Sequence, residues 1–482
     1  MIEVIVNKTG FEYDIHSLVK AFFPREEVSV RAGETYTDRT ALQMAVTFSE
    51  RSVTVELLKD GNPAETRQEE IDPGDRKETK SRMKRLIYRM LCAYTGQELP
   101  WGTLTGIRPV KLAMQLLEAG KSNVETAAYM REVYLASREK AALSVMIANR
   151  ERYVLQNIDY QDGYSLYIGI PFCPSTCLYC SFTSYPLSKW EKQVDLYLDA
   201  LFREIDAMAE HFRRRKLNTV YIGGGTPTTL SPGQMDRLLG RIQTAFEMTH
   251  LQEFTVEAGR PDSISREKLQ VLLDHGIDRI SVNPQTMKDE TLRIIGRHHT
   301  VAQTKEAFAL AREMGFSHIN MDLIVGLPGE GYKDVEHTMQ EIAALAPDSV
   351  TIHSLAIKRA ARLNLFKERY EEMGLENNIQ IMDMTARYCA EMGLSPYYLY
   401  RQKNMAGNFE NVGYARPEQA GIYNILMMEE KQSIVACGAG SVSKRVYPDG
   451  RIERSENVKD VALYIQKIDE MIERKRKLLT DF

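Results

Sequence analysis

The stretch from Ser165 to Phe182 reads SLYIGIPFCPSTCLYCSF and joins a short apolar, strand-like run to a loop that carries three cysteines. Cys173, Cys177 and Cys180 follow the spacing C-x3-C-x2-C. The chain has only six cysteines in 482 residues, which is too sparse for a disulfide framework. A tight group of thiols in a reducing compartment is more often metal-binding or catalytic than cross-linked. The spacing therefore indicates a metal centre on this loop.

Two kinds of metal centre suit three neighbouring thiolates. An iron–sulfur cluster is ligated by cysteine sulfur, and a three-cysteine loop leaves one iron of a [4Fe–4S] cube free for another ligand. Zinc is the first alternative, but a closed structural zinc site needs four ligands, and no Cys or His follows within the next dozen residues. The other cysteines, Cys92, Cys389 and Cys437, lie in apolar contexts, where a cysteine is usually a small buried hydrophobe.

Around this loop, short apolar runs alternate with amphipathic helical segments from residue 161 to residue 355. Six consecutive β/α units predict a parallel sheet with crossover helices, and their length suits a partial (β/α)6 barrel better than a full eight-unit barrel. The expected strands are SLYIGI (165–170), TVYIGG (219–224), EFTVEA (253–258), RISVN (279–283), INMDLIVG (319–326) and SVTIHSL (349–355). The expected helices are 189–211, 232–247, 264–275, 301–314 and 332–345.

An extension flanks the barrel on each side. Residues 1–160 predict an α+β domain, and residues 356–482 predict a second, C-terminal domain. The expected N-terminal elements are strands at 1–6, 41–48 and 52–58, a polar connector over Asp60–Arg76, and helices at 77–97, 110–119 and about 123–157. The expected C-terminal elements are a basic helical segment over Lys358–Met373, helices over Asn377–Met392 and 457–478, and a Tyr-rich stretch PYYLYRQKN.

Composition excludes several classes of protein. Hydrophobic residues make up 43% of the chain and charged residues 27%, which excludes wholesale disorder. The net charge of -4 argues against a polycation that coats nucleic acid. No run approaches the ~18–20 apolar residues of a membrane helix, and the start of the chain lacks the pattern of a signal peptide. We therefore expect a cytoplasmic protein with no membrane segment and no nucleic-acid partner.

The cysteine motif directly after the first barrel strand resembles the radical S-adenosylmethionine (SAM) superfamily, and Tyr179 before the last cysteine fits that pattern. The whole string SLYIGIPFCPSTCLYCSF is similar to the oxygen-independent coproporphyrinogen III oxidase group, which has HemN, HemW and HemZ types. The resemblance continues through YIGGGTP, TVEA and INMDLIVGLPGE, over roughly residues 160–450. The N-terminal extension and the phrases GIRPVKLA and YYLYRQKNMAG resemble the HemZ type most. This resemblance implies an α/β fold with a radical-SAM barrel and a C-terminal HemN-like extension.

The resemblance also implies two cofactors, a [4Fe–4S] cluster and SAM. The three cysteines would be both metal ligands and catalytic residues, and SAM would chelate the open iron. The reduced cluster would then cleave SAM to methionine and a 5′-deoxyadenosyl radical. Tyr167 matches a family tyrosine near SAM and is grouped with the catalytic residues. The expected SAM contacts are Tyr179, Gly224, Gly225, Thr226, Glu257, Gln285, Arg297 and Asp322.

Each of these positions has a physical reason and a plainer alternative. A glycine triplet at 223–225 lets a ligand approach the backbone closely, but it also suits a tight β/α turn. Glu257 and Asp322 are acidic residues in apolar runs, which is costly without a partner. Carboxylates suit ribose hydroxyls and an amino group, although a salt bridge to a neighbouring helix would also satisfy them. The planar fork of Arg297 suits the SAM carboxylate.

Three departures from the HemN pattern leave the cluster and SAM positions intact but leave the substrate open. Gly169 stands where HemN-type oxidases commonly have His. Phe182 stands where HemN-type oxidases add a fourth cysteine, and in this respect the chain resembles the HemW haem chaperones. TVEANP becomes TVEAGRP, with Gly259 at the Asn position.

A coproporphyrinogen pocket needs cations for four propionates and apolar walls. The candidates are Lys358, Arg359, Arg362, Arg401 and Lys403, with Tyr397, Tyr398 and Tyr400. The alternative is a solvated helix face with core tyrosines. His298, His299 and His353 suit proton transfer or haem ligation, although lone histidines are more often structural.

The resemblance implies an anaerobic coproporphyrinogen III dehydrogenase, which turns two propionates into vinyl groups and gives protoporphyrinogen IX in haem biosynthesis. Flavodoxin or ferredoxin would reload the cluster. Two alternatives remain: a haem-binding chaperone that keeps the SAM site, and a radical SAM enzyme that modifies or degrades haem.

Overall fold

The computed structural model describes residues 1–33, 36, 42–356, 373–402 and 409–480. The chain divides into two compact units, Met1–Ala148 and Asn149–Phe482. None of the helices in these described ranges is both long and apolar enough to cross a membrane.

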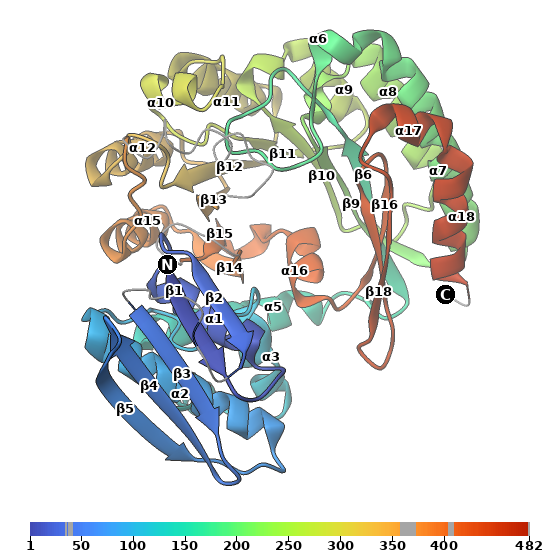
Figure 1. Ribbon diagram of the computed structural model, residues 1–482. Coiled ribbons are helices and arrows are strands. Elements are labelled where there is room, and N and C mark those ends of the chain that lie inside the picture. Colours follow the sequence, from blue (N-terminus) through green and yellow to red (C-terminus); the bar gives the residue numbers. More distant parts are fainter. Residues whose placement is uncertain (34–35, 37–41, 357–372, 403–408, 481–482) are drawn as a thin grey trace. The chain divides into compact units, whose positions relative to one another are not determined.

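The first unit contains a five-stranded sheet in the order β2-β1-β3-β4-β5 (Figure 1). Strand β1 lies parallel to β2 and β3, and β3 and β4 form the antiparallel hairpin that the alternating pattern predicts. Buried apolar side chains of β1, β3 and β4 pack with those of α1 and α2 into one core. The bounds are β1 (Ile2–Val6), α1 (Glu12–Phe22), β2 (Val28–Ala32), β3 (Leu42–Phe48), β4 (Ser52–Lys59) and α2 (Arg76–Thr95).

The prediction of a polar connector over Asp60–Arg76 is wrong for most of its length. Asn62–Glu70 form strand β5, which pairs with β4 in an antiparallel ladder. Its side chains are exposed or half-buried and mostly polar, because β5 lies at the edge of the sheet, where polar and charged residues discourage pairing with other chains. An edge strand with no buried face lacks the apolar alternation by which strands are recognised.

The predicted helix over about 123–157 is two helices. Helix α4 (Asn123–Tyr134) begins with a capping box between Ser122 and Glu125. It ends at Leu135, whose φ of 55° breaks the helical path before α5 (Arg138–Leu155) begins. The predicted helix at 110–119 is confirmed as α3 (Pro109–Glu118).

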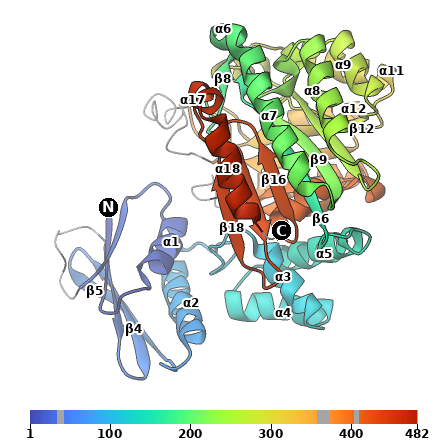
Figure 2. The same ribbon diagram turned by 90° about the vertical axis from the view of Figure 1, so that its right-hand side faces the viewer.

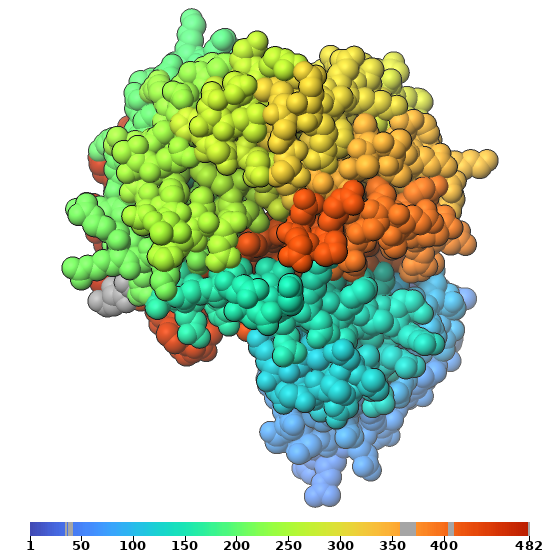
Figure 3. Space-filling view, turned by 180° about the vertical axis from the view of Figure 1, so that it is seen from behind, coloured from blue at the N-terminus to red at the C-terminus, as the bar shows by residue number. Residues whose placement is uncertain are grey.

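The second unit contains the predicted six parallel strands, and the predicted helices between them are confirmed (Figure 1). The strands are β6 (Gly163–Ile170), β9 (Lys216–Gly224), β10 (Glu253–Gly259), β11 (Arg279–Val282), β12 (His318–Val325) and β13 (Ser349–Ser354). The intervening helices are α7 (Val194–Phe212), α8 (Pro232–Ala245), α9 (Arg266–Asp274), α10 (Asp289–Ile294), α11 (Val301–Met314) and α12 (Tyr332–Leu345). Seen from behind, these helical segments form the green-to-yellow outer surface (Figure 3).

Strands from the C-terminal part extend the sheet at both edges. Its full order is β14-β15-β13-β12-β11-β10-β9-β6-β16-β17-β18, and no pairing in the described ranges joins β14 to β18. Strand β16 lies parallel to β6, so the end of the chain returns beside the strand that precedes the cysteine loop. The added strands are β14 (Ser395–Tyr400), β15 (Asn411–Ala415), β16 (Ser433–Cys437), β17 (Val442–Val446) and β18 (Ile452–Glu456).

The predicted C-terminal helix is also two helices, α17 (Val461–Gln466) and α18 (Ile468–Leu479), which lie against α7 (Figure 2). The helix predicted over Asn377–Met392 is confirmed as α15 (Ile379–Glu391), and α16 (Ile422–Glu429) follows β15. The basic helix predicted over Lys358–Met373 lies almost wholly outside the described residues.

The barrel strands have one apolar and one polar face. Tyr164 of β6 packs its ring 4.4 Å from that of Phe212 on α7, so this residue and its alternate neighbours face the helices. Ile168, Ile222 and Ile280 on that face are at most 1% exposed. The residues that alternate with the apolar set form a polar inner face: Tyr167, Tyr221, Glu257, Asn320, Asp322 and His353. The fold therefore places chemistry-bearing side chains inside the curved sheet.

Candidate functional site

The cysteine loop leaves the carboxyl end of β6, at the edge of the sheet where α/β barrels carry their active sites. A short parallel pair, β7 (Phe172–Cys173) and β8 (Tyr185–Pro186), closes the loop at its base. Cys173 and Cys177 are buried, Cys180 is half-buried, and all three thiols are free. The backbone of the loop is also tied to the segment after α10, because Leu178 donates to the carbonyl of Ile295 at 2.9 Å.

The surroundings of the thiols oppose ionisation without a cation. Burial raises the pKa of Cys173 to about 12, although the Thr226 hydroxyl, 3.5 Å from Sγ, partly offsets the effect. Burial likewise raises the pKa of Cys180. Thiolates here therefore require a strong compensating positive charge, which bound iron provides.

In the described ranges, no group of three or more His, Cys, Asp or Glu side chains converges as ligands of one metal ion. In a [4Fe–4S] cube each cysteine binds a different iron, so the three sulfurs need not converge on one point. A one-loop donor set of three thiols therefore fits a cube better than it fits one zinc ion.

The glycine triplet after β9 touches the cysteine loop directly. Gly225 donates to the carbonyl of Ile170 at 2.8 Å, and Thr226 donates to that of Phe172 at 2.7 Å. A Cβ atom at Gly225 would lie 2.6 Å from the Phe172 carbonyl oxygen and 2.9 Å from Cys173 Sγ. Gly224 also has a φ of 110°, which side chains rarely adopt. Close backbone approach, rather than a generic tight turn, explains this triplet.

Glu257 lies near the end of β10, beside a group of stacked aromatic rings. It accepts a hydrogen bond from the Tyr221 hydroxyl at 2.6 Å. The Tyr221 ring stacks 4.6 Å from that of Tyr423 and 6.3 Å from that of Tyr167, measured between centroids. Burial and the nearby charge of Asp322 raise the pKa of Glu257 from 4.5 to about 7, against the opposing effect of the Tyr221 hydrogen bond. This carboxyl group therefore titrates close to neutral pH.

Asp322 lies on the same inner face as Glu257, but its pKa is lowered and not raised. Burial alone would raise its pKa, yet His353 and the amide of Asn320 hold the pKa below its ordinary value. Asn320 Nδ2 donates to Oδ1 at 2.8 Å, and His353 Nε2 lies 3.9 Å from Oδ2. The hydroxyl of Tyr400 lies 3.4 Å from the other ring nitrogen of His353. Asp322 therefore carries a negative charge at the pH where Glu257 is half-protonated.

Arg297 is buried beside the cysteine loop. Its Nη1 donates to the carbonyl of Asn283 at 2.5 Å, and its Nε donates to the Tyr179 hydroxyl at 3.3 Å. Burial opposes its charge, but Tyr179 and Cys177 outweigh burial and raise the pKa of Arg297 above its ordinary value. The position expected from the register thus holds a permanent positive charge near the thiols.

Gln285 has an unusual backbone conformation with a φ of 72°, and it bridges to Leu323 of β12. Its side-chain oxygen has no hydrogen-bond partner in the described part of the chain, and neither do the Asn283 amide oxygen and the Ser281 hydroxyl. Gln285 lines a cavity behind the sheet, whereas the unpaired Ser281 and Asn283 atoms leave hydrogen-bonding capacity for a bound molecule, because buried polar atoms are normally paired. Together with the thiols and the glycine cradle, they fit a cluster and SAM.

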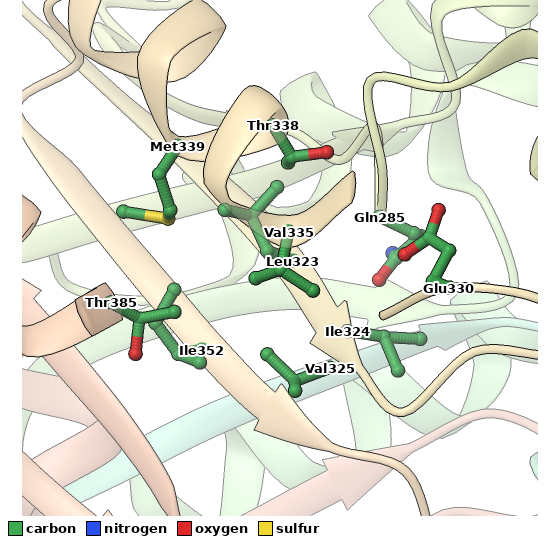
Figure 4. A pocket seen from close by; sticks show the side chains of 10 residues that line it. All are labelled: Gln285, Leu323, Ile324, Val325, Glu330, Val335, Thr338, Met339, Ile352 and Thr385. Atoms are coloured by element: carbon green, nitrogen blue, oxygen red, sulfur yellow. The ribbon is translucent and has the colours of Figure 1, made fainter. Parts of the chain in front are cut away.

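A small cavity of about 10 Å³ lies between β12 and α12 (Figure 4). Its walls include Leu323 and Val325 from the strand and Val335 and Met339 from the helix. Of the expected site residues that the structure describes, Gln285 alone lines this cavity. The cavity therefore lies behind the sheet, on the side that faces the helices.

The expected substrate residues fall into two groups. Lys358, Arg359, Arg362 and Lys403 lie outside the described residues. Arg401, Tyr397 and Tyr398 are each at most 5% exposed, which favours the core alternative for them. Tyr400 does reach the inner face through His353. His298 is exposed, whereas His299 is buried and has no hydrogen-bond partner for either ring nitrogen in the described ranges.

Sequence reasoning missed several residues that the fold brings into the site. Tyr221 lies two residues before the glycine triplet, and the register that stacks it on Tyr167 is visible only in the sheet. Tyr423 comes from α16, far along the chain. Arg260 approaches the cysteine loop, and its signal in the sequence was the departure TVEAGRP.

Comparison with known proteins identifies relatives that share this fold and cysteine loop region. Residues 167–342 match the radical SAM superfamily. The chain is 42% identical to the oxygen-independent coproporphyrinogen-III oxidase-like protein HemZ of Bacillus subtilis over 408 residues, which cover 84% of this chain and 81% of HemZ. It is 39% identical to the haem chaperone HemW of Bacillus subtilis over 195 residues, 40% of this chain and 51% of HemW.

The solved structure of coproporphyrinogen III oxidase HemN from Escherichia coli, a radical SAM enzyme, has a similar fold. The TM-score is 0.53 at 23% identity, with 67% of this chain and 73% of HemN covered. The resemblance in sequence, the fold class and the cofactors are thereby confirmed. The chain belongs to the radical SAM superfamily, whose cofactors are a [4Fe–4S] cluster and SAM, and within it to the oxygen-independent coproporphyrinogen III oxidase-like proteins of the HemZ type.

Proposed function

We propose that the protein is an oxygen-independent coproporphyrinogen III dehydrogenase. Each of two propionate side chains would lose one hydrogen atom, carbon dioxide and one electron, and become a vinyl group. The product is protoporphyrinogen IX. Residues 161–355 are the catalytic barrel in this proposal, residues 356–482 a HemN-like extension and residues 1–160 an accessory domain. An electron donor such as flavodoxin or ferredoxin would serve it in the cytoplasm.

The site residues have separate tasks in this proposal. Cys173, Cys177 and Cys180 hold the cluster, which together with SAM supplies the one-electron chemistry that removes a hydrogen atom from the substrate. The carboxylate of Asp322 and the guanidinium of Arg297 suit the amino and carboxylate groups of an amino acid. The glycines at 224 and 225 let the backbone approach the cysteine loop where a side chain would collide with it. Tyr167, Tyr179, Glu257 and Gln285 complete the proposed SAM contacts.

The observation that carries the proposal is the pair of carboxyl groups on the inner face. Asp322 is ionised and Glu257 has a pKa of about 7. Both side chains belong to a half-buried polar wall on the inner face of the sheet. Burying such a wall costs free energy unless ligands satisfy it. This wall supports binding of a polar ligand such as SAM inside the barrel, on which the proposed dehydrogenase chemistry depends.

A haem chaperone is the second candidate. Phe182 supports it, because this aromatic residue follows the third cysteine, where HemN-type oxidases have a fourth cysteine, and it is 70% exposed. An exposed aromatic side chain beside the cysteine loop suits stacking on a flat, hydrophobic macrocycle.

The deciding experiment is anaerobic incubation of reconstituted protein with SAM, dithionite and coproporphyrinogen III, followed by mass spectrometry. Monovinyl and divinyl products support the dehydrogenase. Tight haem binding without any turnover of coproporphyrinogen would replace it with the chaperone. In a parallel incubation with haem, consumption of haem would indicate a haem-modifying radical enzyme.

A further inference from the structure

Strand β10 ends in a bulge that redirects the chain toward the cysteine loop. Its pairing with β11 shifts register between Glu257 and Gly259. Gly259 has a φ of 58°, a conformation that side chains rarely adopt. Bulges next to active sites commonly re-aim a side chain. Here the residue that follows the bulge is Arg260.

Arg260 spans two partners with its planar fork. On one side, Nε and Nη2 donate to the two carboxylate oxygens of Asp262 at 2.9 and 2.6 Å. On the other side, Nη1 donates to the hydroxyl of Ser175 at 2.6 Å and to its carbonyl at 3.2 Å. The arginine is only 2% exposed. A buried guanidinium with four well-formed hydrogen bonds is both costly to displace and fixed in orientation.

Ser175 is the middle residue of the segment between the first two cysteines. Its hydroxyl also donates to the carbonyl of Gly296 at 2.9 Å, next to Arg297. The centre of the loop is thus tied both to the end of β10 and to the segment after α10. The guanidinium of Arg260 therefore lies against the segment that joins Cys173 to Cys177.

We propose that Arg260 is a positioning residue for the cysteine loop: it holds Cys173 and Cys177 in ligating geometry and supplies positive charge beside the cluster. This inference rests on the proposed role of the three cysteines as cluster ligands. Cluster potentials depend on nearby charge and hydrogen bonding, so the two parts of the role have different readouts. Orientation governs how firmly iron is held, and charge governs the reduction potential.

Two substitutions separate these parts. Arg260→Lys keeps the charge, but one ammonium group cannot reproduce a fork that spans Asp262 and Ser175. Arg260→Gln removes both the charge and the fork. The matched control is Arg266→Gln, because Arg266 is exposed and its ion pair with Glu313 lies on the helical surface.

The test measures the rate of iron release to a chelator, and the midpoint potential by an EPR-monitored titration, on reconstituted full-length protein. Both Arg260 variants should release iron about tenfold faster than the wild type. The potential should fall only in Arg260→Gln, by about 59 mV, which is a tenfold change for a one-electron couple. Arg266→Gln should match the wild type in both measurements. Wild-type release rates in both Arg260 variants would overturn the inference.

Ser175→Ala provides a second route if an Arg260 variant does not fold. This substitution removes the hydroxyl that accepts from Arg260 and leaves the charge of Arg260, so it should speed iron release without changing the reduction potential. An unchanged release rate would refute the role of Arg260 in holding the loop. Cys177→Ala distinguishes this inference from the proposed function. Retention of a normal cluster in Cys177→Ala would refute the ligand assignment itself, whatever the Arg260 variants do.

Discussion

Replacement of Glu257 by Gln should stabilise the SAM-free protein and weaken its binding of SAM. Burial raises the pKa of this carboxyl group from 4.5 to about 7, so the fold disfavours its ionised form. The introduced amide keeps an oxygen that can accept from the Tyr221 hydroxyl, now 2.6 Å from Glu257 Oε1, but never carries the charge. We infer that the negative charge of Glu257 is offset by bound SAM, which carries a positive charge.

The magnitude follows from the shift in pKa. One pKa unit corresponds to ~1.4 kcal/mol, so the ionised carboxylate costs up to about 3 kcal/mol of folding free energy above pH 7. The folded-state pKa is raised, so the protonated form is the one that the fold favours. That relative stability is present below pH 4.5 and is lost as the pH rises through about 7. The gain from Glu257→Gln should therefore be largest at pH 8 and small at pH 5.

Thermal unfolding of the reconstituted protein without SAM, at pH 5 and pH 8, measures this gain. At roughly 2 °C per kcal/mol, Glu257→Gln should raise Tm by up to about 6 °C at pH 8. The control Glu313→Gln, at an exposed ion pair, should change Tm little at either pH. In anaerobic calorimetry, SAM should bind Glu257→Gln about 10- to 100-fold more weakly, the usual effect of losing a charged hydrogen bond. An equal loss of Tm at both pH values, or unchanged SAM affinity, would refute the reasoning.

Three further substitutions test other parts of the account. Gly225→Ala should abolish the visible absorption of the cluster, because the new Cβ would lie 2.6 Å from the backbone oxygen of Phe172; a normal spectrum would contradict the cradle. Glu204→Gln should lower stability by about 3–5 kcal/mol in denaturant unfolding, because it leaves the fully buried Lys475 without its ion-pair partner, and adding Lys475→Met should recover much of the loss. Arg297→Lys should weaken SAM binding about 10- to 100-fold in equilibrium titration while keeping its charge, whereas unchanged affinity would exclude a role for its planar fork.

The sequence predicted the barrel because each strand there has a buried apolar face and a helix that follows it. The strand at the C-terminal edge was harder to predict, because Asn411–Ala415 is only five residues long with Gly413 at its centre, and it pairs with β13 and β14. Likewise, nothing local in Ser433–Cys437 indicates that this strand pairs with β6. Breaks within helices were missed at Leu135, where only the backbone dihedral marks the end.

Within the site, spacing was enough to select residues at the strand ends but not their partners. Glu257 was expected as a ligand contact, yet its pKa depends on Tyr221 and on burial, which require the register of three strands. Arg260 could not be assigned from its type, because most arginines are exposed. Its role depends on the bulge at Gly259, which turns a departure from the family pattern into a contact with the cysteine loop.

The central claim is that the loop from Cys173 to Cys180 carries a cluster that acts on SAM. The most direct measurement is iron content together with 5′-deoxyadenosine released under dithionite, in the wild type, Cys177→Ala and Cys437→Ala. The account predicts about four irons per chain and 5′-deoxyadenosine in the wild type and in Cys437→Ala, and neither in Cys177→Ala. Wild-type iron and 5′-deoxyadenosine in Cys177→Ala would contradict it.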